Sequence, residues 1–190
     1  MIYFVNLPNP VNNVLLKIIG MCLLLTNTLA QSSPCDLTQF ESTPEKQFIA
    51  TNLGTVLDTK TNLEWKVCME GKTWQNGTTC IGTLEEYNWQ SALEIANSLN
   101  TTEGFAGKYN WRLPNIKELA TIFEFRCRGE INPNIFSAYP IKYQKFQAVW
   151  SSSPQSTRSY SWVMAVKGPS GQPRIYQHYV RLVRDAVTPR

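Results

Sequence analysis

The chain has 190 residues, a length that suits one domain with its own hydrophobic core. It is 43% hydrophobic and only 17% charged, with six tryptophans, which excludes an intrinsically disordered protein and predicts a large buried core. The formal net charge of +4 is modest for the whole chain, so a strongly basic surface requires an uneven distribution of charge.

The first 30 residues have the features of a secretory signal peptide. Lys17 precedes an apolar run from Ile18 to Leu25, and Thr28 and Ala30 are small residues at the two positions that a signal peptidase reads. The alternative is a membrane anchor, but this run is far shorter than the roughly twenty residues needed to cross a bilayer. We predict cleavage after Ala30 and export of a single domain, residues 31–190, to the periplasm, the cell surface or the extracellular space.

Cleavage removes Cys22 and leaves Cys35, Cys68, Cys80 and Cys127. An even number of cysteines in an oxidising compartment predicts two disulfides. We expect Cys68 to pair with Cys80 across a short loop and Cys35 to pair with Cys127, although four cysteines permit two other pairings. A zinc site of four thiolates is disfavoured because its ligands usually come in CxxC pairs, which the chain lacks.

The N-terminal half of the mature chain predicts an arm, a hairpin and a loop. Residues 31–52 are polar and interrupted by proline, which predicts an extended arm tied down by Cys35 and little else. Two β-prone stretches, 55–57 and 63–67, flank the polar residues 58–62 and predict a β-hairpin. Residues 69–82 are rich in Gly, Thr and Asn and predict a loop closed by its own disulfide.

Two capping boxes then predict two helices. Thr83 with Glu86 precedes apolar residues at helical spacing and predicts a helix over 84–99. Asn115 with Glu118 predicts a second helix over 116–125. Trp111 and Leu113 are expected beneath the second helix, and Arg112 is expected to pair at the hairpin turn near Asp58.

Beyond Cys127 the pattern becomes β. The runs "AVWSSS", "YSWVMAV" and "HYVRLVR" are rich in β-branched and aromatic residues and are separated by Pro, Gly and Ser. The predicted order is therefore an N-terminal hairpin, two helices and a C-terminal antiparallel sheet. This order is typical of an α+β fold.

No motif of the sequence indicates catalysis. His178 is the only histidine, and Ser151, Ser152 and Ser153 lack the G-x-S-x-G setting of an exposed nucleophile. The acidic residues of the middle segment fit helix caps and solvated helix faces, and the chain has no phosphate loop, HExxH or calcium loop. We therefore predict a protein that is not an enzyme and that uses no cofactor or metal.

The distribution of charge indicates a ligand class. From Ile141 onward the chain contains eight Lys and Arg residues but only one acidic residue, Asp185. This excess of positive charge predicts an anionic partner such as a polysaccharide or a glycosaminoglycan-like polymer, rather than nucleic acid. The ligand-binding candidates are Arg174, Arg181, Arg184, Lys142 and Lys145. Arg181 and Arg184 are three residues apart and point to opposite faces of a regular strand, so at most one of them joins a flat patch. The alternative is a solvated sheet face whose charge prevents aggregation.

The segments "GTVLDTKTNLEWKVC", "WRLPNIKEL", "VWSSSP" and "YVRLVR" resemble the Lcl C-terminal domain family in order and spacing. The resemblance extends from about Cys35 to Arg184 and implies a C-type-lectin-like fold. The family is named after a bacterial collagen-like adhesin whose domain adheres to glycosaminoglycans, so the resemblance also implies an adhesin-like binding module. The chain lacks a collagen-like stalk and a Glu-Pro-Asn calcium motif, which argues against calcium-dependent sugar binding.

Two other functions remain open. One is a structural or assembly protein that contacts another surface protein through the lectin-like scaffold. The other is an oxidase of the formylglycine-generating type, which shares the lectin-like superfamily and requires a reactive cysteine pair or a copper site. Titration of free thiols distinguishes that oxidase from a protein with two complete disulfides.

Overall fold

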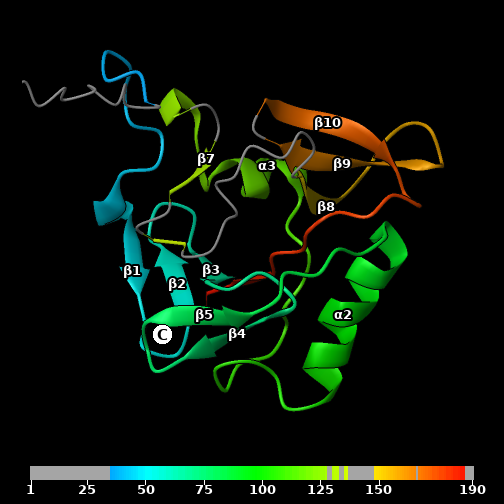
Figure 1. Cartoon of the computed structure of the whole chain (residues 1–190), viewed down its shortest axis with the longest axis horizontal. Coiled ribbons are helices and arrows are strands. Elements are labelled where there is room, and N and C mark those ends of the chain that lie inside the picture. The colour runs from blue at the N-terminus through cyan, green and yellow to red at the C-terminus, as the bar shows by residue number, and fades with distance from the viewer. Residues whose placement is uncertain (1–34, 128–129, 133–134, 137–147, 166, 187–190) are drawn as a thin grey trace, which may run out of the picture. The chain divides into compact units, whose positions relative to one another are not determined.

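The computed structural model describes residues 35–127, 130–132, 135–136, 148–165 and 167–186. The predicted signal peptide, Lys142 and Lys145 lie outside these residues. Figure 1 shows the described elements as α+β, with mostly antiparallel sheets and few helices.

A four-stranded sheet is built around the predicted hairpin. Strands β2 (Thr55–Asp58) and β3 (Leu63–Lys66) pair in antiparallel register, which confirms the hairpin. Strand β1 (Phe48–Ala50) adds to one edge, beside β2 (Figure 1), and β11 (Val183–Asp185) adds to the other. The strand order is β1-β2-β3-β11. Trp65 lies opposite both Val56 and Val183 in this register, so three fully buried side chains cross the centre of the sheet.

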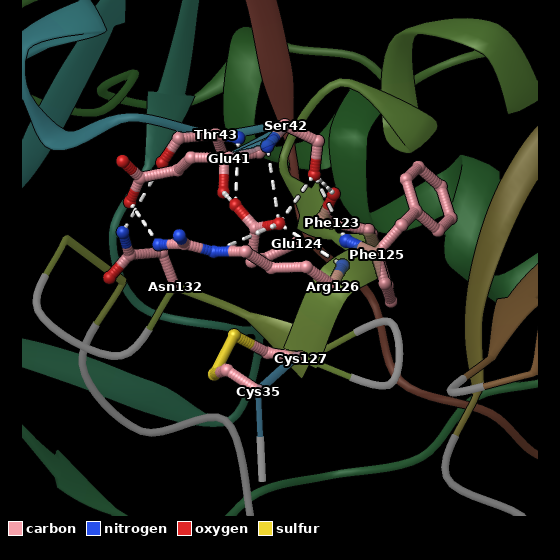
Figure 2. The surroundings of a disulfide bond; sticks show 10 residues. All are labelled: Cys35, Glu41, Ser42, Thr43, Phe123, Glu124, Phe125, Arg126, Cys127 and Asn132. Carbon is pink, nitrogen blue, oxygen red and sulfur yellow. Dashed lines mark hydrogen bonds and ion pairs between the residues drawn. A yellow bond between two sulfur atoms is a disulfide. The ribbon is translucent and has the colours of Figure 1, made fainter. Parts of the chain in front are cut away.

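The N-terminal arm is more firmly attached than the sequence indicated. After the short helix η1 (Glu45–Gln47), its residues 48–50 form β1. Figure 2 shows Ser42 and Thr43 against the buried carboxylate of Glu124, which accepts hydrogen bonds from both backbone N–H groups and both hydroxyls. The arm is therefore held by a strand and a buried carboxylate as well as by Cys35.

The two disulfides are Cys35–Cys127 and Cys68–Cys80, as predicted. The first joins the arm to the short helix η2 (Phe125–Cys127) (Figure 2). Beside it, Arg126 forms an ion pair with Glu41 at 2.8 Å. The arm and η2 therefore share both a covalent and an ionic link.

The segment predicted as a loop closed by Cys68–Cys80 is a second hairpin. Strand β4 (Lys72–Gln75) pairs with β5 (Thr79–Gly82). The turn contains Asn76 and Gly77 with φ of 54° and 70°, and this Asn-Gly pair at positive φ is the usual signal of a two-residue hairpin turn. The signal was present in the sequence, but the Gly- and Thr-rich composition favoured a loop.

Helix α2 (Trp89–Thr101) begins five residues later than predicted, and the capping box at Thr83 and Glu86 does not form. Tyr87 exchanges backbone hydrogen bonds with His178 instead, at 2.9 and 3.0 Å. Because this bridge keeps the backbone extended up to residue 87, the helix starts only after Asn88, whose side chain accepts from Ser91 N–H.

Helix α3 (Ile116–Ala120) has the predicted capping box at Asn115 and Glu118 but ends before the predicted residue 125. The chain returns to an extended conformation in β6 (Phe123–Glu124), which pairs with β7 (Glu130–Ile131). Burial of Phe123 and of the Glu124 carboxylate in the core outweighs the continuation of the helix.

The second main sheet has the order β10-β9-β8 (Figure 1). Strands β8 (Ala148–Pro154) and β9 (Tyr160–Ala165) correspond to two of the predicted β runs. Strand β10 (Gly168–Pro173) was missed because its sequence, GPSGQP, has the composition of a turn. Proline lacks an N–H to donate to a neighbour, and it is tolerated here because β10 lies at the edge of the sheet.

Two apolar clusters form the core. One contains Trp65, Phe123 and Phe136, and the other contains Trp111, Leu113 and Trp150 together with Ala92 and Ala96 of α2. Trp111 and Leu113 were expected beneath the second helix, but they belong to the cluster formed with α2, the β8–β9 sheet, Phe105, Val180 and Leu182, whereas Leu119 of α3 belongs to the other cluster.

Candidate ligand-binding surface

Arg181 lies in the interior rather than on a basic surface. Its side chain is fully buried, its Nη1 donates to the carbonyl oxygens of Lys66 and Val67, and its guanidinium lies 4.9 Å from the centroid of the Phe136 ring. These hydrogen bonds hold the end of β3 to the segment that leads into β11. Because Arg181 is buried, the prediction that it binds a ligand is wrong.

Arg184 is also buried, at 7% exposure. It donates from Nη1 to Glu64 at 2.7 Å and from Nε to the carbonyl of Tyr109 at 3.1 Å. Burial by itself raises the pKa of Glu64, but hydrogen bonds from Lys108, Thr55 and Arg184 outweigh it and lower the pKa. Arg184 therefore neutralises the buried carboxylate of Glu64. The prediction that Arg184 binds a ligand is wrong.

Arg112 does not reach the hairpin turn. It makes a bidentate ion pair with Glu118 of the α3 capping box, at 2.8 and 3.0 Å, and a third contact with Asp185 of β11. These hydrogen bonds raise the pKa of Arg112 above its ordinary value. Asp58 instead accepts a hydrogen bond from Nε2 of Gln47, at 2.8 Å.

Arg174 is the predicted arginine that the described structure leaves partly exposed. Its guanidinium lies 4.1 Å from the centroid of the Trp89 ring, and its Nε donates to the hydroxyl of Ser161 at 2.9 Å. The backbone of Arg174 also accepts from Trp89 N–H and donates to Ser159 O. The side chain is thus fixed between the start of α2 and strand β9.

A shallow groove surrounds this arginine. Its lining residues are Asn88, Trp89, Gln90, Arg174 and Ile175. Ile175 is 80% exposed and forms an apolar wall, while the indole N–H of Trp89 points away to the carbonyl of Ser151. The groove therefore combines one fixed cation with an apolar side chain at the surface.

Two further bases of the C-terminal segment, Arg158 and Lys167, are exposed. Arg158 directly precedes Ser159, whose carbonyl bonds the backbone of Arg174, so the two arginines come from adjoining segments. Sequence reasoning did not select Trp89 or Arg158. Trp89 was assigned to the core because it continues the apolar spacing of the helix, and Arg158 had no neighbouring motif.

His178 packs in the interior. Its ring meets Trp150 edge to face with 4.8 Å between centroids, and it is 7% exposed. Burial lowers the pKa of His178 to about 4 because the charged imidazolium would lose its hydration. The ring is therefore neutral at pH 7 and packs against Trp150.

Among the described residues, no three His, Cys, Asp or Glu side chains gather in a way that fits a metal ion. No helix in the described part of the chain has the length and apolarity to cross a bilayer. The cysteines of the described domain, Cys35, Cys68, Cys80 and Cys127, are all in disulfides.

The chain was compared with curated proteins and with protein-family models. No curated protein matches the chain. A family model for the Lcl C-terminal domain matches residues 54–184, which extends from the residue before β2 to the middle of β11 and includes the groove around Arg174. Since this match covers more than half of the chain, the protein belongs to the Lcl C-terminal domain family.

Proposed function

We propose that this protein is an exported, non-enzymatic binding module that attaches to an anionic glycan at a cell surface or outside the cell. Family membership supports an adhesin-like surface role, and two disulfides are typical of proteins that mature in an oxidising compartment. The proposal includes a C-type-lectin-like scaffold, as the family resemblance implies.

The observation that carries the proposal is the pair of arginines, Arg158 and Arg174, at the end of the β9–β10 hairpin where Tyr160 lies opposite Pro173. Arg158 is exposed and Arg174 is half-buried, and neither forms an ion pair with a described residue. Lys167 is also exposed but lies in the β9–β10 turn, at the other end of the hairpin. Cations without counter-ions attract a polyanion and release its condensed ions on binding.

The test is retention on immobilised heparin over a salt series. We expect the mature protein to elute only at raised salt, and an Arg158→Ala plus Arg174→Ala variant to elute markedly earlier. Lys46→Ala plus Lys60→Ala is the matched control, because it removes the same charge from exposed residues of η1 and the β2–β3 turn. Elution of the unmodified protein without added salt, or equal effects of the two double variants, would contradict the proposal.

A second candidate is assembly with another surface protein. Tyr160, Ile175 and Tyr176 are 37%, 80% and 52% exposed and lie close in the chain to the Arg174 groove, with Tyr160 opposite Pro173 in the β9–β10 register. Tyr and Arg are enriched in the centres of protein interfaces. Association that persists at high salt and is lost in Ile175→Ser would favour this candidate over a polyanion.

A further inference from the structure

The guanidinium of Arg174 is held in place before any ligand arrives. One face lies on the Trp89 ring, and Nε is occupied by the Ser161 hydroxyl, whose residue is itself fully buried. Stacking and the single tether restrict an otherwise flexible side chain, so little further rotamer entropy is lost when a ligand binds.

The tether also determines which edge of the guanidinium is available. Because Nε is used, the remaining donors are on the edge that carries Nη1 and Nη2, and this pair forms no hydrogen bond or ion pair with a described residue. Two parallel N–H donors match two oxygens of one carboxylate or sulfate better than a single hydroxyl. The free edge of Arg174 is therefore suited to an oxyanion.

Trp89 cannot offer the face that Arg174 covers to a sugar ring. The Trp89 side chain also packs against the cluster that contains Trp111 and Trp150. Recognition in the groove therefore depends on the cation and on Ile175, whose exposed side chain can contact the C–H face of a pyranose next to the charged group.

We infer that the Trp89–Arg174 groove is an oxyanion subsite that binds one carboxylate or sulfate group of the glycan through the Nη1/Nη2 edge of Arg174. This inference rests on the proposed function and adds its geometry: Arg174 binds as a fork, while Arg158 contributes charge alone. A uronate carboxylate and a sulfate ester share this chemistry.

The experiment compares two substitutions that keep the net charge. Arg174→Lys removes the fork and the flat stacking surface, whereas Arg158→Lys changes an exposed cation that has no stacking partner among the described residues. We expect Arg174→Lys to weaken binding about tenfold, because a charge-assisted bidentate contact is replaced by a single one. Arg158→Lys should change affinity by no more than about twofold.

Affinity is measured by calorimetry for heparin fragments, for polygalacturonate fragments and for neutral dextran. If Arg174→Lys loses affinity only for heparin, the bound group is a sulfate, and if it loses affinity only for polygalacturonate, the bound group is a carboxylate. A loss of affinity for both polymers means that the subsite accepts both kinds of oxyanion. If the protein binds a polyanion but Arg174→Lys and Arg158→Lys behave alike, the subsite is wrong and the proposed function stands. If it binds neither polyanion, both proposals fail.

Ser161→Ala supplies the control for positioning. It leaves Arg174 and Trp89 intact but frees Nε, so we expect a loss of about threefold and no additional loss when it is combined with Arg174→Lys. The Nε–H resonance of Arg174 in the unmodified protein should shift on addition of the fragments. An unmoved resonance together with equal affinities of Ser161→Ala and the unmodified protein would overturn the assignment. Thermal unfolding of each variant verifies that the domain remains folded.

Discussion

Several buried charged side chains join segments that are far apart in the chain. Glu124 accepts hydrogen bonds from Ser42 and Thr43, more than eighty residues earlier, and Glu64 binds Arg184 from the opposite end of the domain. A buried charge is costly unless its partners are complete. The stability of such residues therefore depends on every partner being present.

Glu124→Gln should destabilise the domain by about 2 to 3 kcal/mol, because an amide oxygen replaces a carboxylate that accepts from the arm. Burial raises the pKa of Glu124, but hydrogen bonds from Thr43 and Ser42 outweigh it and lower the pKa below its ordinary value of 4.5. The carboxylate thus stabilises the fold fully above that value, and its contribution is lost as the pH falls below it.

Denaturant unfolding of Glu124→Gln and the unmodified protein at pH 7 and pH 3 measures this effect. The difference between them should be large at pH 7 and smaller at pH 3. Glu94→Gln is the control, since Glu94 is exposed on α2. A difference independent of pH would contradict the role of the ionised carboxylate.

His178→Phe should make the domain less sensitive to acid. The pKa of His178 is lowered from 6.5 to about 4 in the fold, so protons bind the unfolded chain first as the pH falls between these values. The linked loss of stability is at most about 3 kcal/mol. Phenylalanine keeps the edge-to-face contact with Trp150 and cannot titrate.

The measurement is the free energy of unfolding at pH 7 and pH 4. The decline between these values should be smaller in His178→Phe than in the unmodified protein. An equal decline in both proteins would show that His178 is not responsible for it.

The two hairpins are coupled through a glycine and a tryptophan. Gly54, before β2, has a φ of 81°, and a Cβ placed there would lie 2.5 Å from Trp74 of β4. Trp74 also donates from its indole to the carbonyl of Asn52. Because the β4–β5 hairpin packs its tryptophan directly over this glycine, no larger residue fits.

Gly54→Ala should therefore destabilise more than Gly77→Ala. Both glycines have positive φ, which costs an alanine about 1 to 2 kcal/mol, but a Cβ at Gly77 would meet nothing closer than 3.7 Å. Gly54→Ala adds a clash with Trp74 and should cost at least twice as much. Thermal or denaturant unfolding compares the two, and equal losses would indicate that Trp74 moves away freely.

The folded domain is larger than the family match. Residues 35–53 precede that match, yet they provide β1, the partners of Glu124 and the donor to Asp58. Phe48 also packs edge to face against Phe136, with 5.7 Å between ring centroids. Thr43, Gln47 and Phe48 of the N-terminal arm are therefore packed against the core.

A chain that begins at Gly54 should fail to unfold cooperatively, whereas a chain that begins at Gln31 should unfold in one transition. The shorter chain leaves the carboxylates of Asp58 and Glu124 without their buried donors and leaves Cys127 unpaired. Near-ultraviolet circular dichroism during heating distinguishes these outcomes. A cooperative transition in the shorter chain would show that the arm is dispensable.

Local patterns in the sequence were sufficient for the β2–β3 hairpin, the capping box of Asn115 and both disulfide pairings. The hairpin and the cap depend on neighbours within a few residues, and cleavage of the signal would leave four cysteines with few ways to pair. The family was also accessible from short motifs. These features need little knowledge of the rest of the fold.

The tertiary structure decided the start of α2, the strand character of β10 and the environment of each arginine. Tyr87 stays extended because it pairs with His178, ninety-one residues later, and GPSGQP becomes a strand because β9 supplies its partner. Arg181 is buried with hydrogen bonds to distant backbone carbonyls, and Arg184 is buried in an ion pair with Glu64. Arg174 stays near the surface, against the Trp89 ring. A sequence shows that a residue carries charge, but the access of that charge to a ligand depends on partners brought together only by folding.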